Sequence, residues 1–277
     1  MILVAPKGLI DGCRLPFNGG VDPHILLGAL LIGAGVGFLS GAFGKGGSAV
    51  STPLLHALGV PAIVAIASPL PATIPSTLLA SRGYARAGHV DRDVLRIGVI
   101  VGLPLTAFGA FLTRWIAGGS LVLATDAILL AISLRVLLVA HATAAGDEAE
   151  VQSGVPHRVS RTRTVGVVAV AAMVSGLLGN SGGFLLAPLF MNVLRMPVRR
   201  ALGTSLALAA VLAVPGTIVH AWLGHIDWSL SLVFGTASVP FAALGATAAL
   251  RVRERSLTLA YGVGLAMLSG GLLAFAR

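Results

Sequence analysis

Two glycine-rich segments contain the residues of this chain that are best suited to bind a charged ligand. The first, residues 41–47, places Lys45 between glycines, and the second, residues 176–183, contains Asn180 and Ser181. A helix that restarts after such a segment leaves its first N–H groups without intrahelical partners, at the positive end of the helix dipole. These groups bind anions, and glycine lets a ligand approach the backbone closely. The two segments therefore predict an anion site.

The candidate site residues come from these segments and from a second matched patch of small polar side chains. Ala67-Ser68-Pro69 in the first half of the chain corresponds to Gly203-Thr204-Ser205 in the second. The predicted substrate-binding set is Gly44, Lys45, Gly46, Gly47, Ser48, Ser68, Asn180, Ser181, Gly182, Gly183, Thr204 and Ser205. The lysine ammonium would hold the charge of an anion, and the hydroxyl and amide groups would donate hydrogen bonds to it.

Each of these features also has a structural interpretation. Small residues let membrane helices pack closely, a lysine can extend its ammonium to the membrane interface, and serine and threonine hydroxyls often bond to their own helix. Asp126 lies inside an apolar run and would either carry a coupling proton or pair with a basic group. Asp91 and Asp227 precede apolar runs and are interpreted as helix N-caps.

The composition of the chain indicates that these residues lie in a membrane protein. Hydrophobic residues make up 56% of the sequence and charged residues 10%, and the mean hydropathy is +0.94. Soluble domains are about a quarter charged. The net charge of +9 comes from short clusters between apolar runs, so it does not indicate nucleic-acid binding. The single cysteine, Cys13, excludes an internal disulfide, and we expect no cofactor and no metal site.

The apolar runs predict an all-α polytopic membrane protein of about eight to ten helical segments. They cover residues 24–58, 60–81, 97–117, 119–140, 165–194, 198–222, 229–250 and 256–276. The runs that contain the glycine-rich segments have 35 and 30 residues, whereas one membrane-spanning helix needs about 20. Each is therefore predicted to be a hairpin of two helices separated by a glycine break.

The two halves of the chain are related by an internal repeat. Gly88-His89-Val90-Asp91 recurs 136 residues later as Gly224-His225-Ile226-Asp227, and Pro53-Leu54 recurs 135 residues later as Pro188-Leu189. Apolar composition alone would not place a four-residue polar match and a proline match at offsets that differ by a single residue. The predicted organisation is a short N-terminal tail (1–22), a first transmembrane repeat (23–140), a cytoplasmic linker (141–164) and a second transmembrane repeat (165–277), each repeat having a glycine-broken hairpin and three transmembrane helices.

Basic residues predict that the two repeats have opposite orientations in the membrane. The loop after the second element carries several arginines in the first half, but residues 220–229 in the second half contain none. Conversely, the loop before that element is basic in the second half, whereas residues 59–63 carry no charge. Positive loops face the cytoplasm, so equivalent loops lie on opposite sides. Inverted repeats with interrupted helices are typical of secondary transporters.

The motifs as a whole resemble those of the TauE/SafE sulfite exporter-like permease family. The resemblance rests on the glycine breaks followed by Pro53-Leu54 and Pro188-Leu189, on the matched small-polar patch, and on the two Gly-His-Val/Ile-Asp loops, and it covers about residues 30–275. It implies transport of sulfite, sulfonates and related organic anions across the bacterial plasma (inner) membrane by a multi-pass protein. Lys45 and Ser48 replace glycines that are usual in the family, and Ser68-Pro69 replaces Thr-Ser.

The sequence therefore predicts a secondary transporter (permease) for small anions, working by alternating access at a midplane site. Its partners would be a small anionic substrate and the lipid bilayer, with no nucleic acid, and we expect no enzyme activity. Three alternatives stay open: a membrane protein that binds an anion without transporting it, an intramembrane serine hydrolase using Ser181, and a cation carrier. The scarcity of intramembrane carboxylates argues against divalent metals as the cargo. The sequence is also compatible with a homo-oligomer.

Overall fold

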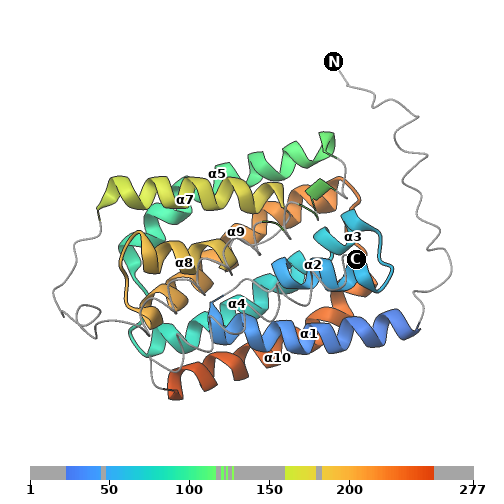
Figure 1. Cartoon of the computed structure of the whole chain (residues 1–277), viewed down its shortest axis with the longest axis horizontal. Coiled ribbons are helices and arrows are strands. Elements are labelled where there is room, and N and C mark those ends of the chain that lie inside the picture. Colours follow the sequence, from blue (N-terminus) through green and yellow to red (C-terminus); the bar gives the residue numbers. More distant parts are fainter. Residues whose placement is uncertain are drawn as a thin grey trace.

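The computed structural model describes residues 23–44, 48–116, 120, 121, 123, 127, 160–178 and 183–252 (Figure 1). All regular structure within these residues is helical, which confirms the predicted all-α class. The elements are α1 (Pro23–Phe43), α2 (Ser48–Ala57), α3 (Ala62–Ala67), α4 (Pro69–Arg86), α5 (Arg92–Leu112), a 3-10 turn (Thr113–Trp115), α7 (Arg161–Leu177), α8 (Gly183–Asn192), α9 (Val198–Trp222) and α10 (Trp228–Arg251). The tail, most of the linker and the runs predicted at 119–140 and 256–276 lie outside the described residues, apart from a few positions.

Five described segments are long and apolar enough to cross a membrane, and the protein is a multi-pass membrane protein. They are Pro23–Phe43, Ala62–Arg86, Arg92–Trp115, Val198–Trp222 and Trp228–Arg251. Large apolar side chains such as Leu31, Ile100 and Ile218 are exposed on the outside of this bundle. A water-facing surface would not tolerate so many of them, whereas lipid does.

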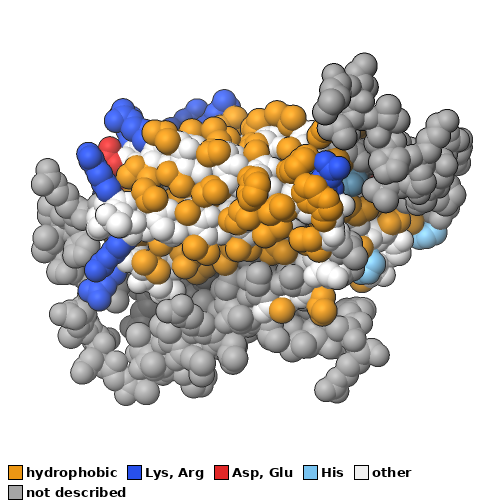
Figure 2. Space-filling view, turned by 90° about the horizontal axis from the view of Figure 1, so that it is seen from above, with side chains coloured by type: hydrophobic (Ala, Val, Ile, Leu, Met, Phe, Trp, Pro, Cys, Tyr) orange, Lys and Arg blue, Asp and Glu red, His pale blue; other side chains and the backbone are white. Residues whose placement is uncertain are grey.

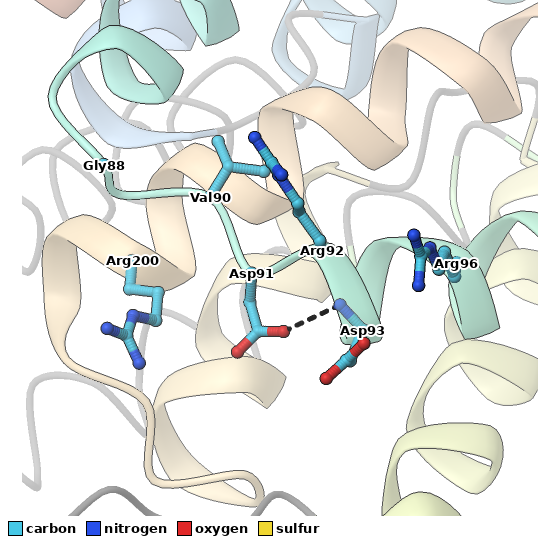
Figure 3. Close-up of a pocket in the computed structure, with 7 residues that line it drawn as sticks. All are labelled: Gly88, Val90, Asp91, Arg92, Asp93, Arg96 and Arg200. Carbon is cyan, nitrogen blue, oxygen red and sulfur yellow. Dashed lines mark hydrogen bonds between the residues drawn. The ribbon is translucent and has the colours of Figure 1, made fainter.

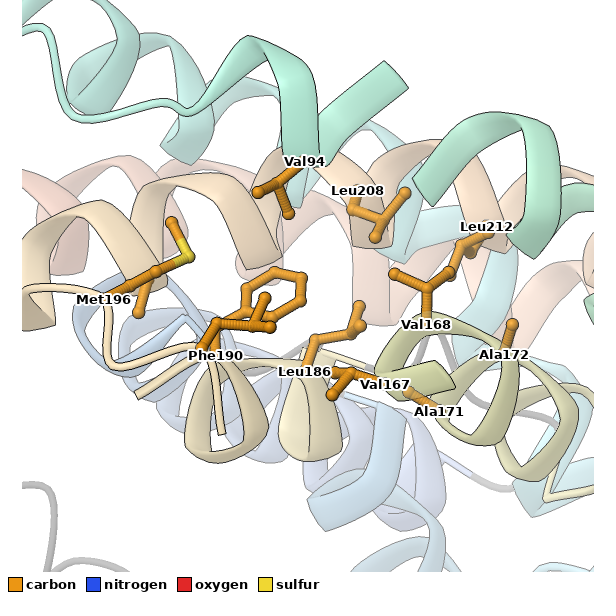
Figure 4. Close-up of a cluster of buried hydrophobic side chains, with 12 residues drawn as sticks. Val94, Val167, Val168, Ala171, Ala172, Leu186, Phe190, Met196, Leu208 and Leu212 are labelled. Carbon is orange, nitrogen blue, oxygen red and sulfur yellow. The ribbon is translucent and has the colours of Figure 1, made fainter. Parts of the chain in front are cut away.

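Both predicted glycine breaks separate two helices that fold back on each other. Leu55, near the end of α2, packs in one cluster with Ile25 and Ala29, near the start of α1. In the second half, Phe190 of α8 packs in one cluster with Val168 of α7 (Figure 4). Each pair is therefore a hairpin whose two outer ends lie together and whose break lies at the inner end. In Figure 1, α1 and α7 run in opposite directions along the molecule.

Each hairpin packs against the third long helix of the opposite half. A Cβ at Gly41 of α1 would overlap the carbonyl oxygen of Ala242 in α10, and a Cβ at Gly176 of α7 would overlap that of Thr106 in α5. These contacts correspond under the repeat register. Gly41 and Gly176 therefore serve close helix packing, which the sequence allowed as an alternative.

These contacts divide the described helices into two groups. The first consists of α1, α2, α3, α4 and α10, and the second of α5, α7, α8 and α9. The main joint between the groups is the contact of α4 with α9. Helix α10, from the second half of the sequence, thus belongs to the first group, and α5, from the first half, belongs to the second.

The repeated Gly-His-Val/Ile-Asp loops form two turns with the same backbone. Gly88 and Gly224 end their helices with φ values of 75° and 72°, in the left-handed region that glycine favours. Asp91 and Asp227 then cap α5 and α10. The side chain of Asp91 accepts hydrogen bonds from the backbone N–H groups of Asp93 and Val94, and that of Asp227 accepts one from Leu230. The prediction that both aspartates are N-caps is confirmed.

Two element boundaries differ from the sequence prediction. The first helix of the second half begins at Arg161 and not at 165, because its polar first turn is already helical and the Thr164 hydroxyl donates to the carbonyl oxygen of Ser160. The second element of the first half is divided at Ser68, between α3 and α4, whereas its counterpart α9 is continuous. Pro69 has no N–H to continue the helical hydrogen bonds, whereas Ser205 at the equivalent position has one.

Charge is unevenly distributed between the two ends of the bundle. Figure 2 shows most of the basic side chains of the described residues gathered at one end, with histidines at the other. Among the described arginines, only Arg114 lies at the histidine end, where its guanidinium stacks on Phe111 and Trp115. Trp115, Trp222 and Trp228 are exposed at that same end. We refer below to the basic end and the histidine end.

Candidate functional site

The structure describes five of the predicted site residues together with the backbone of a sixth. Gly44, Ser68, Gly183, Thr204 and Ser205 are described, and Ser48 is described as the first residue of α2. The predicted residues outside the described part of the chain are Lys45, Gly46, Gly47, Asn180, Ser181, Gly182 and Asp126. The role of Lys45, and that of Ser181 in the hydrolase alternative, therefore stay predictions.

The inner end of the first hairpin is held by a serine from the opposite half. Gly44 has φ 66°, and its carbonyl oxygen lies 3.0 Å from the Ser205 hydroxyl of α9. The same hydroxyl lies 2.9 Å from the carbonyl oxygen of Leu202, so its proton is shared between the two acceptors. A Cβ at Gly44 would lie 2.9 Å from the Leu202 Cα. Glycine is required here both by its φ and by this close approach.

Ser68 and Thr204, which match each other in the repeat, make equivalent hydrogen bonds. The Thr204 hydroxyl accepts the backbone N–H of Asp91 at 2.9 Å, and the Ser68 hydroxyl accepts that of Asp227 at 3.0 Å. Both hydroxyls are fully buried. Each ties the start of α5 or α10 to a helix more than 100 residues away in the sequence. Their observed contacts are thus interhelical anchors, and their predicted role in ligand binding is untested.

Two helix N-termini lie at the inner ends of the hairpins. After the first break, α2 starts at Ser48, and its first turns carry Ser51 and Thr52, which are fully buried. After the second break, α8 starts at Gly183, which is buried. In the view of Figure 1, both helices begin toward the middle of the molecule. Their first N–H groups can donate to an anion without any protonation step.

A protein-family comparison decides where this arrangement belongs. The family model described as "Sulfite exporter TauE/SafE" matches residues 29–272, which include the second hairpin, the first hairpin from Ala29 onward, and both matched turns. This chain belongs to the TauE/SafE family. No solved structure matches it.

The relatives of this TauE/SafE chain are named as transporters. A "Probable membrane transporter protein" of Xylella fastidiosa (strain 9a5c) is 30% identical over 227 residues, which cover 79% of this chain and 84% of the relative. The "Probable membrane transporter protein YunE" of Bacillus subtilis (strain 168) is 25% identical over 233 residues, which cover 78% of this chain and 84% of the relative. Together with the membrane-spanning helices, these matches identify a multi-pass membrane transporter.

The structure adds polar residues near the first hairpin that the sequence analysis did not select. Tyr84 is fully buried, and its hydroxyl lies 3.4 Å from the carbonyl oxygens of both Gly41 and Ala42, at the inner end of α1. Its repeat counterpart is His220, also fully buried, whose Nδ1 lies 3.1 Å from Nδ1 of His225. Tyr84 and His220 each lie five residues before the histidine of their Gly-His-Val/Ile-Asp loop, and this matched spacing was the available sequence signal.

The histidine pair of this TauE/SafE chain has one polar atom without a partner. Nε2 of His220 is buried and accepts or donates no hydrogen bond within the described part of the chain. Burial lowers the pKa of His225, which lies in the turn outside the membrane-spanning segments. The lowered pKa favours the neutral form of His225, which can exchange a hydrogen bond with the His220 ring.

Proposed function

We propose that this TauE/SafE protein is a secondary transporter for small anions such as sulfite, sulfonates or related organosulfur anions. The observation that carries the proposal is the pair of helix N-termini, α2 and α8, placed at the inner ends of two hairpins from matched parts of the chain. A carrier must bind an anion inside the membrane, where unpaired N–H donors at helix starts are suited to it. The family membership supports the same substrate class.

We further propose that the two halves are inverted repeats in the bacterial inner membrane, with the basic end in the cytoplasm. The opposite directions of α1 and α7 and the matched contacts of Gly41 and Gly176 support the inverted relation. The gathering of arginines at one end supports the orientation, because positive loops are retained in the cytoplasm. The predicted linker then lies inside the cell.

In this mechanism, Lys45 and the first N–H groups of α2 and α8 hold the anion, and the two helix groups rock about the joint of α4 with α9. The moving units are these two groups, since each hairpin is interlocked with the third helix of the opposite half. The hydrogen bond from Ser205 to Gly44 crosses this joint. This hydrogen bond stabilises either the inward-open or the outward-open state, and it must rearrange when the protein changes to the other state.

The test is thermal stabilisation of the purified protein by anions, measured for the wild type and for Lys45→Ala. Sulfite, sulfonates, thiosulfate, carboxylates and chloride are screened at equal ionic strength. We expect one sulfur anion to raise the unfolding temperature selectively, because a ligand that binds only the folded state stabilises it. Lys45→Ala should lose this shift.

Arg114→Ala is the matched control, because it removes one exposed positive charge at the histidine end. It should keep the full shift. The proposal is wrong if no anion stabilises the wild type, or if Lys45→Ala responds as the wild type does. Flux of the stabilising anion into proteoliposomes then separates a transporter from a protein that only binds it.

A further inference from the structure

An open cleft of about 420 Å³ lies at the basic end, between the turn that joins α4 to α5 and the start of α9 (Figure 3). Three arginines line it. Arg92 and Arg96 come from the first turns of α5, and Arg200 comes from the first turn of α9. Two helices that are far apart in the sequence thus place guanidinium groups around one space.

Among the described residues, the three guanidinium groups have no protein partner for their charge. Within the described part of the chain, Arg92, Arg96 and Arg200 form neither a hydrogen bond nor an ion pair with a side chain. The carboxylates of Asp91 and Asp93 also line the cleft, and that of Asp91 is engaged by backbone N–H groups as an N-cap. Three positive charges against two negative ones leave the cleft positive. Guanidinium groups bind oxyanions through paired N–H donors.

The wall of the cleft is joined to the first hairpin through two consecutive residues. Thr204 accepts the N–H of Asp91 in the cleft wall, and Ser205 bonds to Gly44 at the inner end of the hairpin. The preceding residue, Gly203, packs against the Tyr84 side chain and the His89 carbonyl oxygen. The cleft therefore lies next to the region in which the proposed function places the substrate.

The matched turn at the histidine end has no such arginines. Under the repeat register, Arg92, Arg96 and Arg200 are replaced by Trp228, Leu232 and Val64. The backbone of the two turns is the same, so the repeat does not require a positive cleft at either end. The arginines are an added property of one end.

We propose that this cleft is the site at which the protein first captures its anionic substrate on the basic side. It takes a small oxyanion of the sulfonate or sulfate type, held by Arg92, Arg96 and Arg200. The inference rests on the proposed function, because the cleft would be an additional binding site for the same anion before it reaches the hairpins. Positive clefts concentrate oppositely charged ligands by about ten-fold or more.

The experiment uses thiol reactivity as a local measure of anion concentration. The only cysteine is Cys13, so Cys13→Ser provides a thiol-free background. Val90→Cys then places a reporter in the cleft, and Ser229→Cys, the counterpart of Asp93, places a control reporter at the exposed surface of the other turn. In phosphatidylcholine nanodiscs, each thiol reacts with a sulfonate-bearing or a trimethylammonium-bearing methanethiosulfonate, and the ratio of the two rates is measured.

We expect the sulfonate-to-ammonium rate ratio to be about ten-fold higher at Val90→Cys than at Ser229→Cys, at low ionic strength. The triple variant Arg92→Gln/Arg96→Gln/Arg200→Gln should bring the two ratios within about two-fold of each other. Ethanesulfonate should protect the cleft reporter, and choline should not. Asp93→Cys supplies a second reporter in the same cleft if Val90→Cys does not fold.

The matched charge control is Arg82→Gln/Arg86→Gln/Arg163→Gln, which removes three exposed arginines from the same end outside the cleft. The proposal is overturned if this control lowers the ratio as much as the cleft variant, or if the two reporters react alike. It is also overturned if only phosphatidylglycerol in the nanodisc protects the thiol, which would indicate a lipid headgroup site. These rates do not depend on transport or on Lys45, so they can fail independently of the proposed function.

Discussion

The turn between α4 and α5 and the turn between α9 and α10 have the same backbone but different surfaces. In both, a glycine with positive φ ends one helix, an aspartate caps the next, and a buried hydroxyl accepts the aspartate N–H. One turn carries arginines around an open cleft, whereas the other carries the exposed Trp228. Arginine suits a cytoplasmic surface, and tryptophan suits a membrane interface.

This difference shows which features of the repeat are constrained by packing. The inward-facing atoms of each turn bond to another helix, so a change there would leave a buried polar group unpaired. Within the described part of the chain, the exposed side chains of Arg92 and of its counterpart Trp228 make no such bond, and the two turns differ at this position. The repeat therefore preserves the framework, and the chemistry of each end depends on residues outside that framework.

The largest effect is expected where the matched packing is closest, at Gly41 and Gly176. Gly41→Val and Gly176→Val each place side-chain atoms against the backbone of the partner helix, α10 or α5. Each should destabilise the protein by at least about 3 kcal/mol, because backbone cannot move aside as a flexible side chain can. Thermal unfolding in detergent measures the loss.

Gly35→Val is the control for this pair, because nothing lies within 4 Å of a Cβ at Gly35. It should unfold within a few degrees of the wild type. If only one of the two glycine variants is destabilised, the crossings of α1 with α10 and of α5 with α7 are not equivalent, and the structural comparison of the halves breaks down.

An intermediate effect is expected from the two hydroxyl anchors. Thr204→Val and Ser68→Ala each remove the acceptor of a buried aspartate N–H. The expected loss is about 1–2 kcal/mol for each, because the N–H is left without a partner. Equal losses would support equivalent anchoring of the two turns. Thr236→Val, whose exposed hydroxyl bonds only to its own helix, should change stability by less than about 0.5 kcal/mol.

The smallest effect concerns pH and applies only to the turn at the histidine end. Burial lowers the pKa of His225 in the folded protein. As pH falls below about 6.5, the unfolded state gains a proton more readily than the folded state, so stability decreases. Above about pH 6.5, His225 is neutral in both states, and the free energy of unfolding is not reduced by its protonation. Thermal unfolding between pH 7.5 and 5 should show this decrease, and His225→Gln should reduce it. If His225→Gln has the same pH profile as the wild type, His225 is not the group that causes the loss of stability at low pH.

Much of the framework was predictable because it depends on local sequence. The glycine breaks after Phe43 and Leu177, and the N-caps at Asp91 and Asp227, follow from residue types within one or two helical turns. The contacts of the candidate site residues were harder to predict from the sequence. Ser68, Thr204 and Ser205 were predicted as substrate-binding residues, a role that stays a prediction, and the hydrogen bonds they make in the structure join them to residues 113 to 161 positions away in the sequence.

The sequence by itself determined the membrane class, the described long apolar helices and the positions of the two glycine breaks. Hydropathy, glycine, proline and capping residues act over short distances along the chain, so their effects can be recognised without a fold. Only the tertiary structure decided that α10 packs with the first group of helices and α5 with the second, and that Arg200 joins Arg92 and Arg96 around one cleft. Helix pairing depends on the shapes of whole surfaces, and no periodicity within one helix specifies its neighbour.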